Sequence, residues 1–259
     1  MESIKAELER LSASGFKEIV LTGINLSCYD DNGKKLIDVI EMADNVNGIE
    51  RIRLGSLDPE VVTEDFVERL GKVKKICPHF HFSLQSGCDK TLKAMNRHYT
   101  SDEYYEKCQL IRKYIDNPAF TTDVIVGFPG ETEEDFQETL DVVRKVRFDS
   151  AFTFIYSKRT GTPAAAMENQ VPEDVVKNRF DRLLKEVQDI SAEVCGRDVH
   201  TVQTVLVEEV NDHSPELVTG RMSNNTIVHF PGDASLIGKL VDVYLEESKG
   251  FYYMGRLNQ

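Results

Sequence analysis

Between residues 17 and 157 the sequence alternates strand-like and helix-like segments, and this alternation constrains the fold more than any other feature. Short runs rich in β-branched and aromatic residues are each followed by a stretch with apolar residues at helical spacing. Connections of helical length between strands imply βαβ units, and therefore a parallel sheet or barrel. The predicted strands are residues 17–23, 49–56, 78–87, 119–130 and 150–157.

A helix at residues 2–14 precedes the first of these strands, although a parallel unit normally begins with a strand. Ile4, Leu8 and Leu11 lie at helical spacing, and Gly15 supplies the stop signal. This order of elements looks like a parallel α/β fold whose first strand is missing.

The pattern changes after Gly196. Residues 197–259 contain short runs rich in Val, Thr and Tyr that are separated by turn residues. Such regularly spaced short strands are typical of a small all-β barrel or sandwich. We therefore expect two domains, at residues 1–196 and 197–259.

Composition and charge exclude several classes of protein. The sequence has no apolar run long enough to span a membrane and no secretory signal, so we expect neither membrane insertion nor secretion. The odd number of scattered cysteines predicts reduced thiols in a cytoplasmic protein. A net charge of −13 argues against nucleic-acid binding by bulk charge. The cysteines are Cys28, Cys77, Cys88, Cys108 and Cys195.

Several predicted strands alternate polar and apolar residues, whereas parallel strands covered on both faces are continuously apolar. If the apolar faces pack on helices, the polar faces meet inside a barrel and form a candidate site. A solvated sheet face or structural ion pairs would give the same pattern. The polar positions are Arg51, Arg53, His79, His81, Ser83, Gln85, Thr121 and Asp123.

Gly, Ser, Thr, Asn and Gln are frequent at the C-terminal ends of all the predicted strands, where α/β barrels place their chemistry. A turn that needs positive φ explains Gly55 or Gly87 taken alone. His79 and His81 lack a neighbouring Cys or carboxylate that would complete a tetrahedral metal site. The GFPGET segment at 127–132 lacks the Gly-Lys-Ser/Thr ending of a phosphate-binding loop.

Five segments, taken in order, resemble the radical S-adenosylmethionine (SAM) methylthiotransferases. Residues 197–259 resemble the TRAM module, the small β-barrel that follows the radical domain in this family and contacts RNA. Within the family, LTGIN (21–25) is most similar to the branch acting on N6-threonylcarbamoyladenosine 37 of tRNA. The isopentenyladenosine and ribosomal-protein branches resemble it less. The segments are residues 18–25, 51–60, 79–100, 122–136 and 152–165.

The resemblance implies a partial parallel (β/α) barrel of the radical SAM type that lacks its first strand, followed by a TRAM-like barrel. The implied reaction inserts a methylthio group at C2 of N6-threonylcarbamoyladenosine 37, with the other two branches as alternatives. S-adenosylmethionine and [4Fe–4S] clusters would supply the radical chemistry and the sulfur transfer. The implied partners are the tRNA anticodon loop and an electron donor.

The matched motifs also imply binding roles for individual residues. Arg97, in the MNRHYT segment, matches a basic family position near the cleft, and Arg197 is a predicted RNA contact. The residues expected to bind S-adenosylmethionine are Thr22, Gly23, Asn25, Gln85, Ser86, Asp123, Gly127, Tyr156 and Arg159.

The family's cluster ligands have no counterpart in this sequence. The family holds its catalytic cluster with Cys-x3-Cys-x2-Cys after the first strand, and a preceding domain supplies three further cysteines. No three cysteines here share that spacing, so no metal ligands are predicted. We therefore expect the C-terminal portion of such an enzyme, inactive alone.

Two other functions stay open. The chain could be a catalytically inactive tRNA-binding remnant, whose salt-dependent binding would weaken on changing basic residues such as Arg197, Lys239 or Arg256. Local basic residues could form one positive rim on an acidic body: Lys72, Lys74, Lys75, Arg97, His98, Lys158, Arg159 and Arg197. It could also be an unrelated barrel enzyme that uses Asp123 and His81 as an acid–base pair, which the ordered motifs disfavour.

Overall fold

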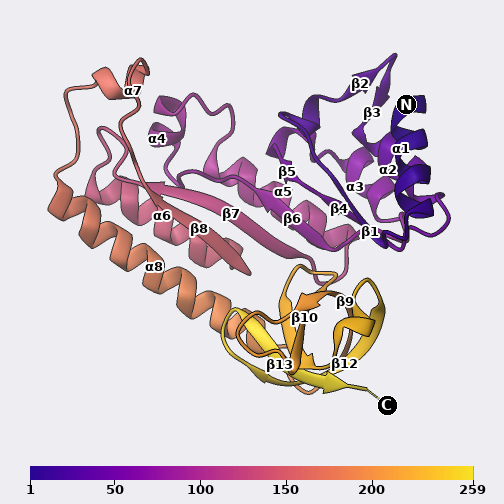
Figure 1. The fold of residues 1–259 in the computed structure, drawn as a ribbon. Helices are drawn as coiled ribbons and strands as arrows, with labels where there is room; N and C mark the ends of the chain where they lie inside the picture. Colours follow the sequence, from indigo (N-terminus) through magenta and orange to yellow (C-terminus); the bar gives the residue numbers. More distant parts are fainter. Residues whose placement is uncertain (259) are drawn as a thin grey trace.

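The computed structural model describes residues 1–258, and its first part is a curved sheet of parallel strands flanked by helices (Figure 1). β1 pairs with β4, and β5, β6, β7 and β8 pair in that order, all in parallel. Among these residues the strands form two hydrogen-bonded groups, the β1–β4 pair and a four-stranded sheet in the order β5-β6-β7-β8, so they make an open, partial barrel. The strands are β1 (Glu18–Leu21), β4 (Arg51–Leu54), β5 (Ser56–Leu57), β6 (His79–Phe82), β7 (Ala119–Val126) and β8 (Ser150–Ile155).

Several helices begin at side-chain caps that the sequence supplies. Thr100 and Thr132 each accept a side-chain hydrogen bond from the backbone N–H three residues on. The carboxylate of the acidic residue at that position accepts a hydrogen bond from the backbone N–H of the threonine. A small hairpin of β2 (Asp30–Asp31) and β3 (Lys34–Lys35) occupies the turn-rich stretch after β1. The helices are α1 (Glu2–Ala13), α2 (Leu36–Asp44), α3 (Glu64–Leu70), α4 (Asp89–Ala94), α5 (Ser101–Tyr114), α6 (Glu133–Val146), α7 (Pro163–Ala166) and α8 (Glu173–Gly196).

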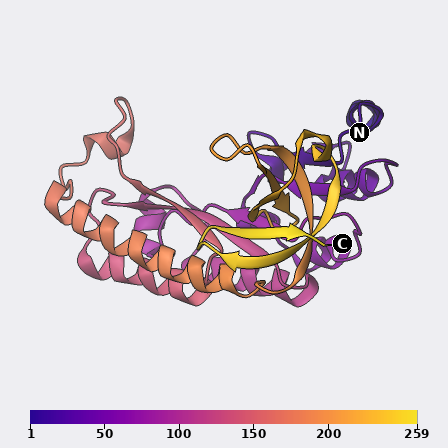
Figure 2. The ribbon, with the colours of Figure 1, turned by 60° about the horizontal axis from the view of Figure 1, so that its bottom comes forward.

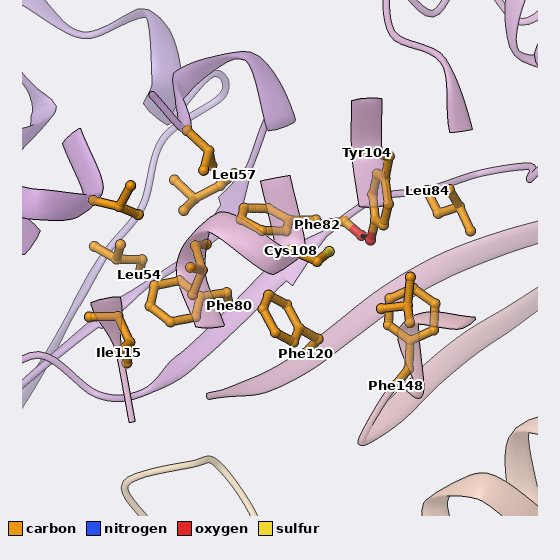
Figure 3. Close-up of a cluster of buried hydrophobic side chains, with 14 of the residues drawn as sticks. Leu54, Leu57, Phe80, Phe82, Leu84, Tyr104, Cys108, Ile115, Phe120 and Phe148 are labelled. Carbon is orange, nitrogen blue, oxygen red and sulfur yellow. Dashed lines mark hydrogen bonds between the residues drawn. The ribbon is translucent and has the colours of Figure 1, made fainter. Parts of the chain in front are cut away.

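The core of this unit lies between the sheet and the helices (Figure 3). Phe80 and Phe82, from alternate positions of β6, are fully buried and pack with Phe120 of β7. Tyr104 of α5 closes the cluster edge-on against Phe82 and donates a hydrogen bond of 2.9 Å to the Phe82 carbonyl. The odd-numbered residues of β6 consequently face the opposite, polar side of the sheet.

The second part is a closed five-stranded barrel with its own core, as the sequence predicts. Helix α8 runs beside α6 along the sheet and leads directly into this barrel (Figure 2). No helix within residues 1–258 is long and apolar enough to cross a membrane. The barrel strands are β9 (Val202–Val210), β10 (Leu217–Met222), β11 (Ile227–Pro231), β12 (Leu240–Ser248) and β13 (Tyr252–Leu257).

Two buried arginines of β4 join the sheet to the barrel. Arg51 donates to the carbonyls of Arg221 at 2.8 Å and Thr204 at 2.6 Å, and Arg53 donates to that of Ser223 at 3.0 Å. Both were candidates for a ligand site inside the partial barrel. The structure assigns them to the contact between the two parts of the chain, where they satisfy carbonyls at the edge of the barrel.

Candidate functional site

A cleft of about 680 Å³ opens at the C-terminal ends of β6, β7 and β8. Apolar side chains form most of its wall, and a few polar groups converge on it, which is the usual make-up of a small-molecule site. The apolar lining includes Met95, Ile125, Phe128, Phe154 and Pro163. The structure brings together here five of the predicted site residues: Gln85, Arg97, Asp123, Tyr156 and Arg159.

Gln85 enters the cleft from the segment that follows β6, in a left-handed conformation with φ of +66°. This conformation costs a non-glycine residue about 1 kcal/mol or more. The backbone compensates, because Gln85 N–H donates to Asp123 O and Gln85 O accepts from Ile125 N–H, both at 2.8 Å. The strained residue is thus held against β7 at the floor of the cleft.

Asp123 supplies a negative charge to the cleft. His81 Nε2 lies 3.2 Å from its Oδ2, and Ser83 Oγ donates to the same oxygen at 2.8 Å. The hydrogen bond from His81 lowers the pKa of Asp123, against the opposing effect of partial burial, and the bond from Ser83 adds to the decrease. Asp123 is therefore a carboxylate at neutral pH.

Tyr156 contributes a buried hydroxyl that has no hydrogen-bond partner among residues 1–258. Its ring packs edge-on against Phe128 at a centroid distance of 5.3 Å. Because buried polar groups are normally satisfied, an orphaned hydroxyl in the wall of a cleft is a candidate ligand contact. Together with the Asp123 anion and the Arg97 and Arg159 cations, it suits a zwitterionic ligand that also carries apolar surface.

The remaining predicted cofactor residues lie outside this cleft. Thr22, Gly23 and Asn25 follow β1, where Thr22 lines a separate groove against α1. Ser86 is buried with its hydroxyl 3.3 Å from that of Thr139 on α6. Gly127 has φ of +77°, and its N–H donates to Glu131 at 3.1 Å.

Arg197, predicted to contact RNA, lies at the end of α8. Its guanidinium forms an ion pair with Asp149 at 3.0 Å, and about a third of its side chain is exposed. In this structure it therefore links α8 to the start of β8.

Gly87 is required by close packing and not by a positive φ. A Cβ at this position would lie 2.6 Å from Thr139 Cα and 2.9 Å from Glu138 O, both backbone atoms of α6. Gly55 also has no positive φ, and its Cβ would crowd Leu21 O at 3.2 Å. The turn explanation is therefore wrong at both positions.

Replacing Gly87 by alanine is expected to lower the free energy of unfolding by about 1–3 kcal/mol, because α6 must shift to admit the methyl group. Urea unfolding monitored by circular dichroism measures the change. Gly196→Ala is the matched control: nothing lies within 4 Å of its Cβ, so helix propensity makes it neutral or stabilising. Equal stability of the two variants would contradict the packing argument.

The described residues do not provide a site for an iron–sulfur cluster. No group of three or more His, Cys, Asp or Glu side chains within residues 1–258 is arranged to hold a metal. Iron takes the thiolate, yet burial raises the pKa of Cys77 to about 11 and that of Cys108 to about 12. These two cysteines are thiols at neutral pH and do not fit the role of cluster ligands.

Comparison with protein families places two known domains on this chain. Residues 1–143 match the Radical SAM superfamily, and residues 196–257 match the TRAM domain. Among solved structures, the coproporphyrinogen III oxidase HemN of Escherichia coli aligns with a TM-score of 0.57 at 12% identity, covering 86% of this chain and 59% of its own. The methyltransferase TsrM of Kitasatospora setae aligns with a TM-score of 0.52 at 19% identity, covering 63% and 32%. These likenesses support the fold.

Curated relatives are similar over nearly the whole chain. A tRNA-2-methylthio-N(6)-dimethylallyladenosine synthase of Lachnoclostridium phytofermentans is 47% identical over 259 residues, covering 99% of this chain and 57% of the relative. An enzyme of the same name from Acetivibrio thermocellus is 45% identical, covering 99% and 54%. This chain thus spans a little over half the length of these relatives.

The names of these relatives correct one expectation. They specify dimethylallyladenosine, so the threonylcarbamoyladenosine branch predicted from the LTGIN segment is wrong. The structure supplies a reason, because this segment follows β1 outside the cleft and its Ile24 is fully exposed. The identity of side chains that do not line the cleft is therefore a weak basis for predicting which ligand the cleft binds.

Proposed function

Because this chain belongs to the radical SAM superfamily and carries a TRAM domain, we propose that it takes part in adding a methylthio group to C2 of N6-dimethylallyladenosine in tRNA. The relatives that match nearly all of its length and bear that activity in their names support the substrate. The cleft at the ends of β6, β7 and β8 is the observation that carries the proposal.

Radical SAM enzymes use S-adenosylmethionine and a [4Fe–4S] cluster, which supply the radical chemistry when bound. In our proposal the residues of this chain bind and orient S-adenosylmethionine in the cleft. Asp123 accepts a hydrogen bond from an ammonium or hydroxyl group, and Arg97 and Arg159 balance a carboxylate or a phosphate. Once a ligand is bound, the apolar wall that includes Phe128 and Phe154 would exclude water from it.

We propose tRNA, with its anticodon loop, as the macromolecular partner, and an electron donor as a further partner of the complete reaction. The TRAM match and the family resemblance support this assignment. We also propose the domain division at residues 196 and 197, which falls at the end of α8. Arg97 and Arg197 remain proposed substrate contacts, the first at the cleft and the second beside the barrel.

Binding of S-adenosylmethionine to this chain tests the proposal. We expect saturable binding by isothermal titration calorimetry, and a Kd weaker by roughly ten- to a hundredfold for Asp123→Asn, because a charge-assisted hydrogen bond contributes about 1.5–3 kcal/mol. Asp141→Asn is the control, since Asp141 lies exposed on α6 and, among the described residues, its side chain bonds only Gln137 and Arg144. Absence of binding, or equal Kd values for the two variants, would refute the assignment of the cleft.

A further inference from the structure

Four side chains on the polar face of β6 and β7 form a continuous chain of hydrogen bonds that ends on Asp123. His79 Nε2 and His81 Nδ1 each lie 3.0 Å from Thr121 Oγ1, and His81 Nε2 lies 3.2 Å from Asp123 Oδ2. The pairing of the strands explains this arrangement. His81 stands directly opposite Thr121 in the parallel ladder, so alternate residues of both strands share this face.

The positions of the protons follow from what each group can do. The Asp123 carboxylate only accepts, so His81 must carry its proton on Nε2. In the neutral ring Nδ1 is then bare and accepts from the Thr121 hydroxyl. The Thr121 oxygen, having donated its own proton, accepts from His79 Nε2–H. Each hydrogen bond in the chain is thus donated toward Asp123.

The far end of the chain agrees with this assignment. His79 Nδ1 is buried without a hydrogen-bond partner among residues 1–258, and in the assigned tautomer it is a bare lone pair. Unsatisfied buried acceptors are tolerated better than unsatisfied buried N–H groups. Burial, assisted by the nearby charge of Arg53, lowers the pKa of His79 to about 3, so its ring is neutral.

Both side chains that donate to Asp123 bond the same carboxylate oxygen. His81 Nε2 and Ser83 Oγ bond Oδ2, whereas Oδ1 has no hydrogen-bond donor within residues 1–258. Asp123 lines the cleft, while His79, His81 and Thr121 line a second cavity, of about 480 Å³, between the sheet and the C-terminal barrel. The hydrogen-bond chain therefore holds the carboxylate through Oδ2, on the side of the second cavity. It leaves Oδ1 for a ligand in the cleft.

We propose that His81 is a positioning residue: the Asp123 carboxylate fixes its tautomer, Thr121 holds the ring through Nδ1, and His81 in turn holds Asp123 so that Oδ1 receives a donor group of the ligand. The identification of that ligand as S-adenosylmethionine rests on the proposed function. The orientation of the hydrogen-bond chain does not depend on it.

Removing the Thr121 hydroxyl tests the proposal. Long-range 1H–15N spectra of the histidine rings should show the Nε2–H tautomer for His79 and His81 at neutral pH. In Thr121→Val, which keeps the shape of the side chain, His81 should keep the Nε2–H tautomer, and its Nδ1 resonance should move to the position of an imidazole nitrogen that accepts no hydrogen bond. The Kd for S-adenosylmethionine should become roughly three- to tenfold weaker, as expected for one lost hydrogen bond.

Two further variants serve as controls. Thr121→Ser keeps the hydroxyl and should restore both the Nδ1 resonance of His81 and the Kd. Thr153→Val removes a half-buried hydroxyl on β8 that makes no side-chain hydrogen bond in the described structure, and should change neither.

An Nδ1–H tautomer of His81 in the unmodified chain, or an unchanged Kd in Thr121→Val, would overturn the proposal. If the unmodified chain binds no S-adenosylmethionine, the proposed function fails, and the spectra alone then decide whether the hydrogen-bond chain is oriented as assigned.

Discussion

Replacing Arg179 by methionine is expected to lower the free energy of unfolding by about 3–5 kcal/mol, because it strands a buried carboxylate. Arg179 lies on α8, and its Nη1 donates to Glu131 Oε1 at 2.9 Å and to Glu131 O at 3.1 Å. The two side chains are 5% and 2% exposed. The same Glu131 oxygen accepts from Gly127 N–H, so the pair also fixes the GFPGET loop beside the cleft.

The unfolding free energy lost in Arg179→Met should depend on pH, and the pKa of Glu131 decides whether the loss grows or shrinks as pH rises. Burial already raises the pKa of Glu131, although Arg179 opposes the increase, and the substitution removes that opposition. A carboxyl group with a raised pKa in the folded state binds a proton more readily there than in the unfolded chain, so stability falls as pH rises between the two pKa values. The variant should therefore lose less stability at pH 5 than at pH 8.

Guanidinium chloride unfolding at both pH values measures the effect. Arg182→Met is the matched control on the same helix, since its ion pair with Glu133 is largely exposed and should be worth under about 1 kcal/mol. A loss in Arg179→Met no larger than in the control would mean that Glu131 finds another partner, or becomes protonated at no cost.

The periodicity of the sequence was sufficient to predict most elements of the fold, because hydrophobic spacing is a local property. Phe80 and Phe82 alternate with His79 and His81, and the structure places the two pairs on opposite faces of β6. The boundaries depended on tertiary contacts. One strand was predicted at 49–56, but it divides at Gly55, whose N–H donates to Leu21 O at 2.8 Å on the neighbouring strand.

The site was predictable only where its residues lie at strand ends. Gln85, Asp123 and Tyr156 converge because parallel strands end at the same edge. The sequence could not show that Ser86 faces α6, or that Arg51 contacts carbonyls more than 150 residues away. The sequence did suggest Asp123 and His81 as a pair, and the two side chains lie within hydrogen-bond distance. The orienting role of Thr121 could not be predicted, because it depends on the register of β6 and β7.

Replacing Glu18 by glutamine is expected to destabilise the protein by about 3–5 kcal/mol and to loosen the C-terminal barrel. Glu18 Oε1 accepts from Arg53 Nε at 2.7 Å, and Oε2 lies 3.6 Å from Arg51 Nη1. Within residues 1–258 it is the only carboxylate within 4 Å of either guanidinium. Burial already lowers the pKa of Arg51, so removing Glu18 leaves two desolvated cations without a counter-ion.

Differential scanning calorimetry should show a midpoint lower by roughly 6–20 °C, the shift that this loss produces in a chain of this size. Glu50→Gln is the control, because Glu50 is half-exposed and lies 3.8 Å from Lys17. Hydrogen exchange locates the effect: β10 and the turn at 223–226 should lose protection, since Arg51 and Arg53 donate to carbonyls there. Destabilisation with unchanged exchange in β10 would mean that the ion pairs stabilise only the parallel sheet. In that case hydrophobic packing at the end of α8, rather than the arginines, would hold the barrel in place.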